Sequence, residues 1–253
     1  MMKAAILTDL TKCAGCKACV YACKEQNDLP KDTPADILSA TTWTIIEKTN
    51  GLNIRRHCMH CEEPACASAC PVGALTKTEA GAVTYDADKC MGCRYCMVAC
   101  PFNMPKYEWS SVTPKVKKCI LCYEKALRRG KQPACTAACP TGATIFGDRD
   151  QLILKANKRI ENSPNRYVNH IYGIKEAGGT AVLYLSAVPF SELGFPGSVQ
   201  EDSYPKLTWK VLSKIPNIVS TSGVFLFGVW WIINRRIKLE NHPELRKGSD
   251  KME

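Results

Sequence analysis

The chemistry of this 253-residue sequence resides in its sixteen cysteines, which fall into four short groups with none left over. One group, Cys90, Cys93, Cys96 and Cys100 followed by Pro101, has the spacing C-x2-C-x2-C-x3-C-P. This spacing is typical of iron–sulfur ligation, because thiolates are soft ligands and three close cysteines hold one cluster while the fourth reaches a second. One such motif therefore implies a partner motif.

The four groups are numbered here in chain order. Motif I is Cys13, Cys16, Cys19 and Cys23; motif II is Cys58, Cys61, Cys66 and Cys70; motif III is Cys90, Cys93, Cys96 and Cys100; motif IV is Cys119, Cys122, Cys135 and Cys139. Motif I repeats the spacing of motif III, although Lys24 replaces the proline, whereas motifs II and IV have longer second gaps. Four motifs of four ligands predict four [4Fe-4S] clusters, with all sixteen cysteines bound to iron.

Two simpler interpretations of the cysteines are a disulfide framework and structural zinc. Three of the groups end in Cys-Pro after an x3 gap, and a chain of this length does not need disulfides to be stable, so a disulfide framework is disfavoured. Zinc is suggested by Cys58 and Cys61, which have His57 and His60 beside them. Zinc ribbons use paired C-x2-C units, however, whereas the spacing x2, x2, x3 suits a cuboidal cluster.

Composition narrows the function classes. The chain is 45% hydrophobic and 23% charged, which is an ordinary balance for one large or two small globular domains. Its formal net charge of +10 would suit a nucleic acid or an anionic lipid surface. Each cluster with its four thiolates carries about −2, however, so four of them lower the net charge to about +2. We therefore expect no nucleic-acid partner.

The segments that position the motifs are expected to be short strands and turns. Residues 41–56 are predicted to form a hairpin, because Asn50 and Gly51 are the strongest two-residue turn signal in the sequence, and this hairpin would deliver Cys58. Further strands are expected at residues 3–8, 82–85, 144–146 and 180–186.

One longer helix is expected after motif IV. Asp148 or Asp150 would cap its N-terminus, and Leu152, Ala156 and Ile160 recur at every fourth position. This apolar face is interpreted as core packing rather than as a cofactor site.

Motifs II and III are separated by the short link 71–89, a spacing that resembles a compact two-cluster ferredoxin. They are therefore interpreted as one unit. Motifs I and IV can then pair only if that unit is inserted between them. Spacing alone leaves open the alternative, in which motif I pairs with motif II and motif III with motif IV.

Residues 215–234 contain no charged side chain and are long enough to form a helix of about 30 Å, the thickness of a hydrocarbon core. Trp230 and Trp231 suit an interfacial belt. Polar residues in the first turns, such as Ser220 and Ser222, favour a helix packed on a partner within the membrane. The alternative is a buried core helix.

Membrane orientation follows from the flanking charges. Five basic residues follow the span and three precede it: Arg235, Arg236, Lys238, Arg246 and Lys247, against Lys206, Lys210 and Lys214. The positive-inside rule then places the C-terminus in the cytoplasm and the cluster domain outside. Too few apolar residues precede Asp9 to form an export signal. The chain would therefore either stay in the cytoplasm or leave it folded, with a partner that carries the signal.

The sequence resembles the iron–sulfur subunits of respiratory complexes over residues 3–234. These are the β subunits of membrane-bound formate dehydrogenases and molybdopterin reductases, and the iron–sulfur partner of membrane nickel–iron hydrogenases. The resemblance rests on the order of the four motifs and on the runs at residues 59–64, 96–105, 118–122, 133–143 and 172–190.

The resemblance implies an α+β fold with two ferredoxin-like dicluster units, one inserted in the other, and a C-terminal transmembrane helix. The expected parts are residues 1–57 with 101–187 as one ferredoxin unit with a C-terminal extension, 58–100 as the inserted ferredoxin unit, 188–214 as a linker, 215–234 as the transmembrane helix and 235–253 as a tail. The implied ligand sets are Cys13, Cys16, Cys19 with Cys139; Cys119, Cys122, Cys135 with Cys23; Cys58, Cys61, Cys66 with Cys100; and Cys90, Cys93, Cys96 with Cys70.

The function expected from these features is electron relay without catalysis. The sequence contains no Ser/His/Asp set, no glycine-rich nucleotide loop and no cysteine outside the four motifs. The chain would pass electrons between a catalytic subunit, of hydrogenase or molybdopterin type, and a polytopic membrane subunit that binds b-type haem or quinone. It would sit in the inner membrane as a single-pass protein with a periplasmic cluster domain. The alternatives are a catalytic iron–sulfur enzyme and an iron–sulfur regulatory or structural module.

Overall fold

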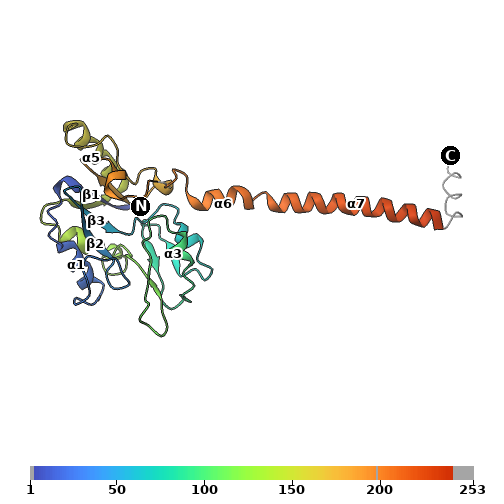
Figure 1. Cartoon of the computed structure of the whole chain (residues 1–253), viewed down its shortest axis with the longest axis horizontal. Helices are drawn as coiled ribbons and strands as arrows, with labels where there is room; N and C mark the ends of the chain where they lie inside the picture. The colour runs from blue at the N-terminus through green and yellow to red at the C-terminus, as the bar shows by residue number, and fades with distance from the viewer. Residues whose placement is uncertain (1–2, 198, 242–253) are drawn as a thin grey trace. The chain divides into compact units, whose positions relative to one another are not determined.

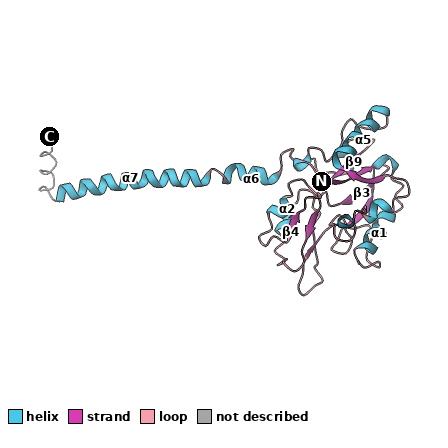
Figure 2. Cartoon of the chain, turned by 180° about the vertical axis from the view of Figure 1, so that it is seen from behind, coloured by secondary structure: helices cyan, strands magenta, loops and turns pink. Residues whose placement is uncertain are grey.

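The computed structural model describes residues 3–197 and 199–241 (Figure 1). The chain divides into two compact units, Met1–Pro205 and Lys206–Glu253. The first unit mixes short helices with short strands and contains every cysteine of the chain (Figure 2). The fold is thus a mixed helix-and-sheet fold with one long apolar helix near its C-terminus, as the sequence predicts.

A three-stranded sheet joins the two ends of the first unit. Its central strand β1 (Ala4–Asp9) is antiparallel to β8 (Thr144–Asp148) and parallel to β9 (Val182–Leu185). β1 is buried along its whole length, which suits a central strand made largely of alanine, isoleucine and leucine. The strands confirm the expectations at residues 3–8, 144–146 and 180–186.

Helix α5 (Arg149–Asn162) packs against this sheet. Asp148 caps it, because its carboxylate accepts a hydrogen bond from the backbone N–H of Asp150 at 3.1 Å. The face formed by Leu152, Ala156 and Ile160 is buried in one hydrophobic cluster with side chains of β1 and β9. Both the cap and the packing face agree with the prediction.

The predicted hairpin at residues 41–56 is formed by β2 (Thr44–Thr49) and β3 (Leu52–His57). Its turn residues Asn50 and Gly51 have φ values of 48° and 76°. Both values lie in the left-handed region that a tight two-residue hairpin turn requires. β3 ends directly before Cys58, so the hairpin leads into motif II.

Short elements surround the cysteines. Four helices each contain at least one motif cysteine: α1 (Ala18–Gln26), α2 (Ala65–Ser68), α3 (Tyr95–Ala99) and α4 (Ala134–Ala137). α1 contacts α4, and α2 contacts α3. The remaining pieces of this unit are the hairpins β4 (Leu75–Lys77) with β5 (Val83–Tyr85) and β6 (Lys106–Tyr107) with β7 (Val116–Lys117), and the 3-10 turns η1 (Leu10–Lys12), η2 (Leu127–Arg129), η3 (Glu176–Gly178) and η4 (Phe190–Leu193). β5 lies where a strand was expected at residues 82–85.

The main core lies among these elements and includes part of the expected linker, residues 188–214. Phe190, Leu193 and Phe195 are buried there. The Phe195 ring packs against Tyr172 and Tyr184 with ring centroids 4.7 and 5.1 Å apart. The segment after β9 is therefore anchored by aromatic packing over its first residues.

The second unit is helical in its described part. α6 (Tyr204–Leu212), which begins at the end of the first unit, is followed after Ser213 and Lys214 by α7 (Ile215–Asn241). The stretch Tyr204–Asn241 is long and apolar enough to cross a membrane, and its most apolar part is not buried by the rest of the chain. The predicted transmembrane segment lies inside α7. The tail from residue 242 onward, with Arg246 and Lys247, lies outside the described residues.

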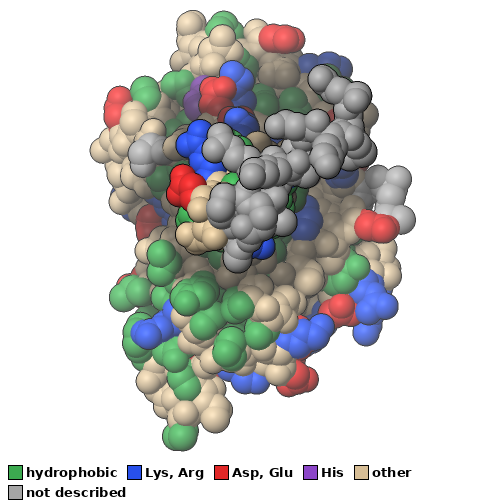
Figure 3. Space-filling model, turned by 90° about the vertical axis from the view of Figure 1, so that its right-hand side faces the viewer, with side chains coloured by type: hydrophobic (Ala, Val, Ile, Leu, Met, Phe, Trp, Pro, Cys, Tyr) green, Lys and Arg blue, Asp and Glu red, His purple; other side chains and the backbone are tan. Residues whose placement is uncertain are grey.

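Exposed hydrophobic side chains are also present on the first unit, and Figure 3 shows one such gathering at its lower left. Among the most exposed large hydrophobic residues of this unit are Val98, Trp109 and Val112. Arg94 lies over the rings of Tyr107 and Trp109.

Candidate metal centres

Motifs I and III hold their first three cysteines on the same local backbone. The glycine before the second cysteine is left-handed in both, with φ 72° at Gly15 and 73° at Gly92. The basic residue after the second cysteine is left-handed too, with φ 59° at Lys17 and 65° at Arg94. A helix begins directly afterwards, so the third cysteine lies in its first turn. The equal spacing of the two motifs thus reflects an equal path of the chain.

Motifs II and IV reach the same arrangement by another route. A proline, Pro64 or Pro133, precedes the helix that contains the third cysteine, Cys66 or Cys135. The extra residues of the second gap come before that proline. They lengthen the loop without changing the relation between the helix and its cysteine.

The structure brings cysteines from distant motifs together. Cys13, Cys16, Cys19 and Cys139, from motifs I and IV, line one cavity, and we name them group A. Cys70, Cys90, Cys93 and Cys96, from motifs II and III, line a second cavity and form group D. Each cavity is lined by one cysteine from one motif and three from another.

For the other eight cysteines the resemblance implies two further groups, and the pKa values of Cys61 and Cys23 are raised by members of the same implied group. Group B is Cys23, Cys119, Cys122 and Cys135, and group C is Cys58, Cys61, Cys66 and Cys100. Burial and then the thiolates of Cys58, Cys100 and Cys66 raise the pKa of Cys61 well above its usual value. Burial and then Cys135 and Cys122 raise the pKa of Cys23 to about 12. Each group thus again combines two motifs.

Electrostatic influence links the groups in the order A, B, C, D. After burial, the pKa of Cys19 in group A is raised by Cys135 in group B. The pKa of Cys119 in group B is raised by burial and then by neighbours that include Cys58 in group C. The pKa of Cys66 in group C, about 12, is raised mainly by burial and in part by Cys96 in group D. Successive groups therefore lie close enough to influence one another.

The donor set fits an iron–sulfur cluster in each group. All sixteen cysteines are free thiols, so none forms a disulfide. Burial disfavours the charged form of the buried cysteines, as in Cys19, whose pKa rises to about 11. Four buried thiolates would repel one another, so positive charge from bound iron is required to hold them deprotonated. At Cys139, hydrogen bonds from the Thr144 backbone and the Thr141 hydroxyl outweigh burial and lower the pKa.

Hydrogen bonds to sulfur support the same chemistry. Backbone N–H groups donate to the Sγ atoms of Cys70, Cys100 and Cys119 at 3.2, 3.5 and 3.4 Å. The side-chain amide of Asn27 donates to the Cys23 Sγ at 3.6 Å. Such hydrogen-bond donors stabilise metal-bound thiolates and change the reduction potential of the metal centre that the thiolates bind.

The two histidines beside motif II serve the packing of that motif. The His60 Nδ1 accepts a hydrogen bond from the backbone N–H of Val83 at 2.9 Å. Both His57 and His60 are buried, and burial lowers their pKa well below the usual range. Within residues 3–197 and 199–241, no three His, Cys, Asp or Glu side chains converge tightly enough to hold a single metal ion.

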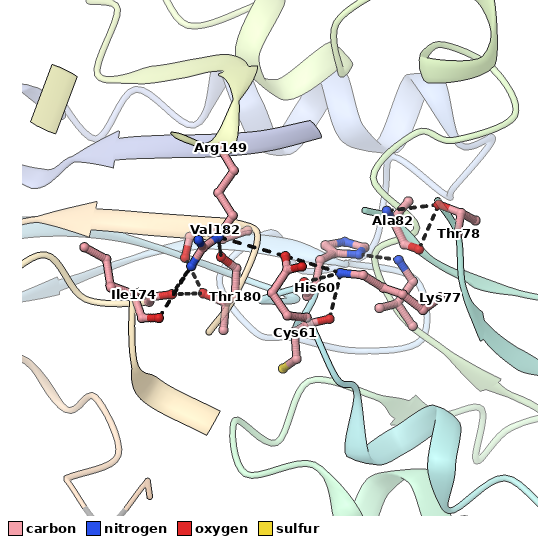
Figure 4. Close-up of polar contacts among 12 residues, drawn as sticks. His60, Cys61, Lys77, Thr78, Ala82, Arg149, Ile174, Thr180 and Val182 are labelled. Atoms are coloured by element: carbon pink, nitrogen blue, oxygen red, sulfur yellow. Dashed lines mark hydrogen bonds and ion pairs between the residues drawn. The ribbon is translucent and has the colours of Figure 1, made fainter. Parts of the chain in front are cut away.

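Motif II is fastened to the sheet by a polar network (Figure 4). The Lys77 ammonium donates to the carbonyls of His60 and Cys61 at 3.2 and 2.8 Å, and it lies 3.6 Å from the Glu62 carboxylate. On the other side, the Arg149 guanidinium donates to the Thr180 carbonyl at 2.9 Å. This network holds Cys61 beside the segment that leads into β9.

Sequence reasoning missed two buried cations near the cysteines, Arg55 and Lys118. The Lys118 ammonium donates to the Cys119 carbonyl at 2.9 Å, and it lowers the pKa of Cys66 against the larger effect of burial. Arg55 lines the cavity of group A. A basic residue near a cysteine in the sequence is too common to be a signal, and only the fold shows that these two are buried.

Comparison with protein families and with characterised relatives gives consistent matches. The family model of a 4Fe-4S dicluster domain matches residues 50–149, and that of a 4Fe-4S binding domain matches residues 10–26.

Three relatives illustrate the similarity, which covers between 76% and 97% of this chain. A protein of Nitratidesulfovibrio vulgaris Hildenborough is 41% identical, over 92% of this chain and 68% of its own length. The hydrogenase-2 operon protein HybA of Escherichia coli O157:H7 is 39% identical, over 76% of this chain and 72% of its own. The iron–sulfur subunit of formate dehydrogenase-O of Escherichia coli K12 is 36% identical, over 97% of this chain and 89% of its own.

Proposed function

Because the chain belongs to the family of iron–sulfur electron-transfer subunits of hydrogenase- and formate dehydrogenase-type respiratory complexes, we propose that it is a four-cluster relay between two partner subunits. Within this family it is an electron-transfer subunit rather than a catalytic one. When bound, each [4Fe-4S] cluster would accept and release one electron at a time.

The ligand assignment that we propose gives one cluster to each of the groups A to D. The cavities lined by groups A and D support this assignment, as do the free thiols and the N–H···S hydrogen bonds. Groups A and B would form the unit of motifs I and IV, and groups C and D the inserted unit of motifs II and III. The contacts of α1 with α4 and of α2 with α3 support this nesting and the domain bounds given above.

The observation that carries the relay is the order of the groups. The pKa of Cys19 is raised in part by Cys135, that of Cys119 by Cys58 and that of Cys66 by Cys96, which supports a row in which each group lies near the next. A single cluster that stored an electron or only supported the fold would not need neighbouring groups in a row. We infer that electrons enter at one end of the row and leave at the other.

The partners that we propose are a catalytic subunit of hydrogenase or molybdopterin type and a polytopic membrane subunit that binds b-type haem or quinone. The relatives' names, which refer to hydrogenase and formate dehydrogenase, support the first partner. The apolar helix α7 supports anchoring in a membrane. The proposed location is the inner membrane, with the cluster domain periplasmic and the C-terminus cytoplasmic.

The experiment that tests the relay is anaerobic purification of the native complex, followed by iron and sulfide analysis. About sixteen iron and sixteen sulfide per chain are expected. A Cys96→Ser complex should keep substrate oxidation with a soluble dye that accepts electrons at the catalytic subunit, and should lose at least about 90% of its quinone reduction. Unchanged quinone reduction in a complex that lacks the group D cluster would instead identify a regulatory or structural module.

A further inference from the structure

Arg55 is a fully enclosed cation beside two of the cysteine groups. It lies in β3 opposite Ile46, and its side chain is among the largest completely buried ones of the described chain, with 1% of its surface exposed. It lines the cavity of group A together with Ile46 and Thr144. Charged side chains are almost never buried to this degree unless something pairs with them.

Hydrogen bonds with neutral groups hold Arg55 in place but do not neutralise its positive charge. Its Nε donates to the Thr44 hydroxyl at 3.2 Å, and the Tyr184 hydroxyl donates to its backbone carbonyl at 2.7 Å. Its Nη1 has no hydrogen-bond partner. Among the ion pairs of residues 3–197 and 199–241, none includes Arg55. A buried guanidinium left in this state would be strongly unfavourable, so a countercharge must lie nearby.

The countercharge available is that of the cysteine thiolates. Burial by itself would lower the pKa of Arg55. The thiolates of Cys135, Cys19 and Cys119 outweigh burial and raise it. These cysteines belong to groups A and B. Four thiolates around an oxidised cluster core carry about −2 in total, so two such sites would face one guanidinium.

We propose that Arg55 raises the reduction potentials of the two clusters that groups A and B would hold; this inference rests on the proposed function. On reduction, each cluster takes one electron from the donor and gains one negative charge, with no bond formed or broken. A fixed cation within a low-dielectric interior stabilises that added charge more than solvent would. The positive charge of Arg55 would thus stabilise the reduced form of these clusters, and Arg55 would not bind their iron.

The test is a potentiometric titration of the full-length chain, purified anaerobically with its clusters and followed by electron paramagnetic resonance. Arg55→Met and Arg55→Gln remove the charge at similar volume, and Arg55→Lys keeps it. In the two neutral variants, the reduction equilibrium constants of two clusters should fall at least tenfold, which is about 59 mV for one electron. The other two clusters should shift less, and Arg55→Lys should restore most of the difference.

Lys17→Met is the matched control. Lys17 lines the same cavity and carries the same charge, but it is only partly buried. Solvent screens its charge, so this variant should shift the potentials less than Arg55→Met does.

Iron analysis separates the possible results. A wild-type chain with fewer than four clusters would reject the proposed function. Four clusters with potentials unchanged in Arg55→Met would reject only the role of Arg55. If both neutral variants lose two clusters, the positive charge serves cluster binding rather than the reduction potential, and the inference is wrong. If Arg55→Lys loses them as well, the guanidinium is structural and the inference is wrong.

Discussion

Gly92 and Gly51 have the same backbone conformation but different surroundings. Their φ values are 73° and 76°. A Cβ at Gly92 would lie 2.7 Å from the Pro114 carbonyl oxygen, whereas a Cβ at Gly51 would meet nothing within 4 Å. The two positions therefore separate the effect of crowding from the effect of left-handed strain.

Gly92→Ala is expected to remove the cluster of group D, because the loop between Cys90 and Cys93 must move to relieve the clash. Bound iron should fall by about one quarter, the share of one cluster in four. Gly51→Ala carries only the left-handed strain of about 1 kcal/mol and should keep its full iron content. The measurement is iron per chain after anaerobic purification. Full iron in Gly92→Ala would contradict the expected rigidity of the loop.

At the level of residues, the sequence predicted the candidate ligands because cysteine types and spacing carry that information directly. All sixteen stand in the structure as free thiols, while the cluster that each would bind stays a prediction. Arg55 could not be predicted. The strand alternates apolar and polar residues over Leu52–Arg55, and this pattern puts Arg55 on the polar face with Asn53, where a solvent-exposed side chain would be expected.

The attachment of α5 to the sheet depends on a buried carboxylate. Asp9, at the end of β1, is fully buried and accepts hydrogen bonds from the Arg159 guanidinium and the Tyr167 hydroxyl, each at 2.9 Å. It also accepts from the Thr11 hydroxyl at 2.7 Å. One carboxylate therefore joins the sheet, the helix and the loop that leads into motif I.

Asp9→Ala should destabilise the first unit by about 3 kcal/mol, because it leaves a partly buried guanidinium and two hydroxyl groups without their acceptor. Asp148→Ala is the comparison, since it removes an aspartate from the start of the same helix and costs about 1 kcal/mol, the usual value of an N-cap. The midpoint of anaerobic denaturant unfolding, followed by loss of the iron chromophore, should fall further in Asp9→Ala. Equal midpoints in the two variants would show that the Asp9–Arg159 ion pair stabilises the unit no more than the N-cap Asp148 does.

At the level of elements, prediction succeeded where a local pattern was strong. The turn at Asn50 and Gly51 and the face of α5 are examples, since both depend on neighbours within a few residues. Helices α2 and α4 have four residues each, which is too short for a helical period to be visible. The parallel pairing of β1 with β9 joins residues far apart in the chain, and no local pattern encodes it.

At the level of the whole molecule, the proposed cluster ligands and the proposed membrane anchor belong to different parts of the chain. All sixteen cysteines lie at or before Cys139, and the first compact unit extends to Pro205. Deletion of residues 215–253 should therefore yield a chain that is released without detergent and keeps its full iron content. The measurement compares iron per chain and membrane partition of the truncated and full-length forms. Loss of the iron chromophore on truncation would mean that the helix is part of the cluster fold.

The last prediction concerns how electrons would pass from the proposed clusters to a quinone. Haem iron in a bilayer takes imidazole or thioether ligands, and α7 (Ile215–Asn241) contains neither histidine nor methionine. Of the four histidines, His57, His60 and His170 belong to the first unit, and His242 lies outside the described residues. The helix can therefore anchor the chain, and we expect a partner subunit to supply the ligands of any haem.

We accordingly expect the purified full-length chain, in detergent and reduced by dithionite, to show iron–sulfur absorption without the sharp bands of a b-type haem. It should also reduce a quinone analogue at least about tenfold more slowly than the intact complex does with the same donor. Adding back the membrane subunit should restore the rate, whereas adding the catalytic subunit alone should not. A haem spectrum from the isolated chain, or native rates without the membrane subunit, would show that this chain completes the transfer by itself.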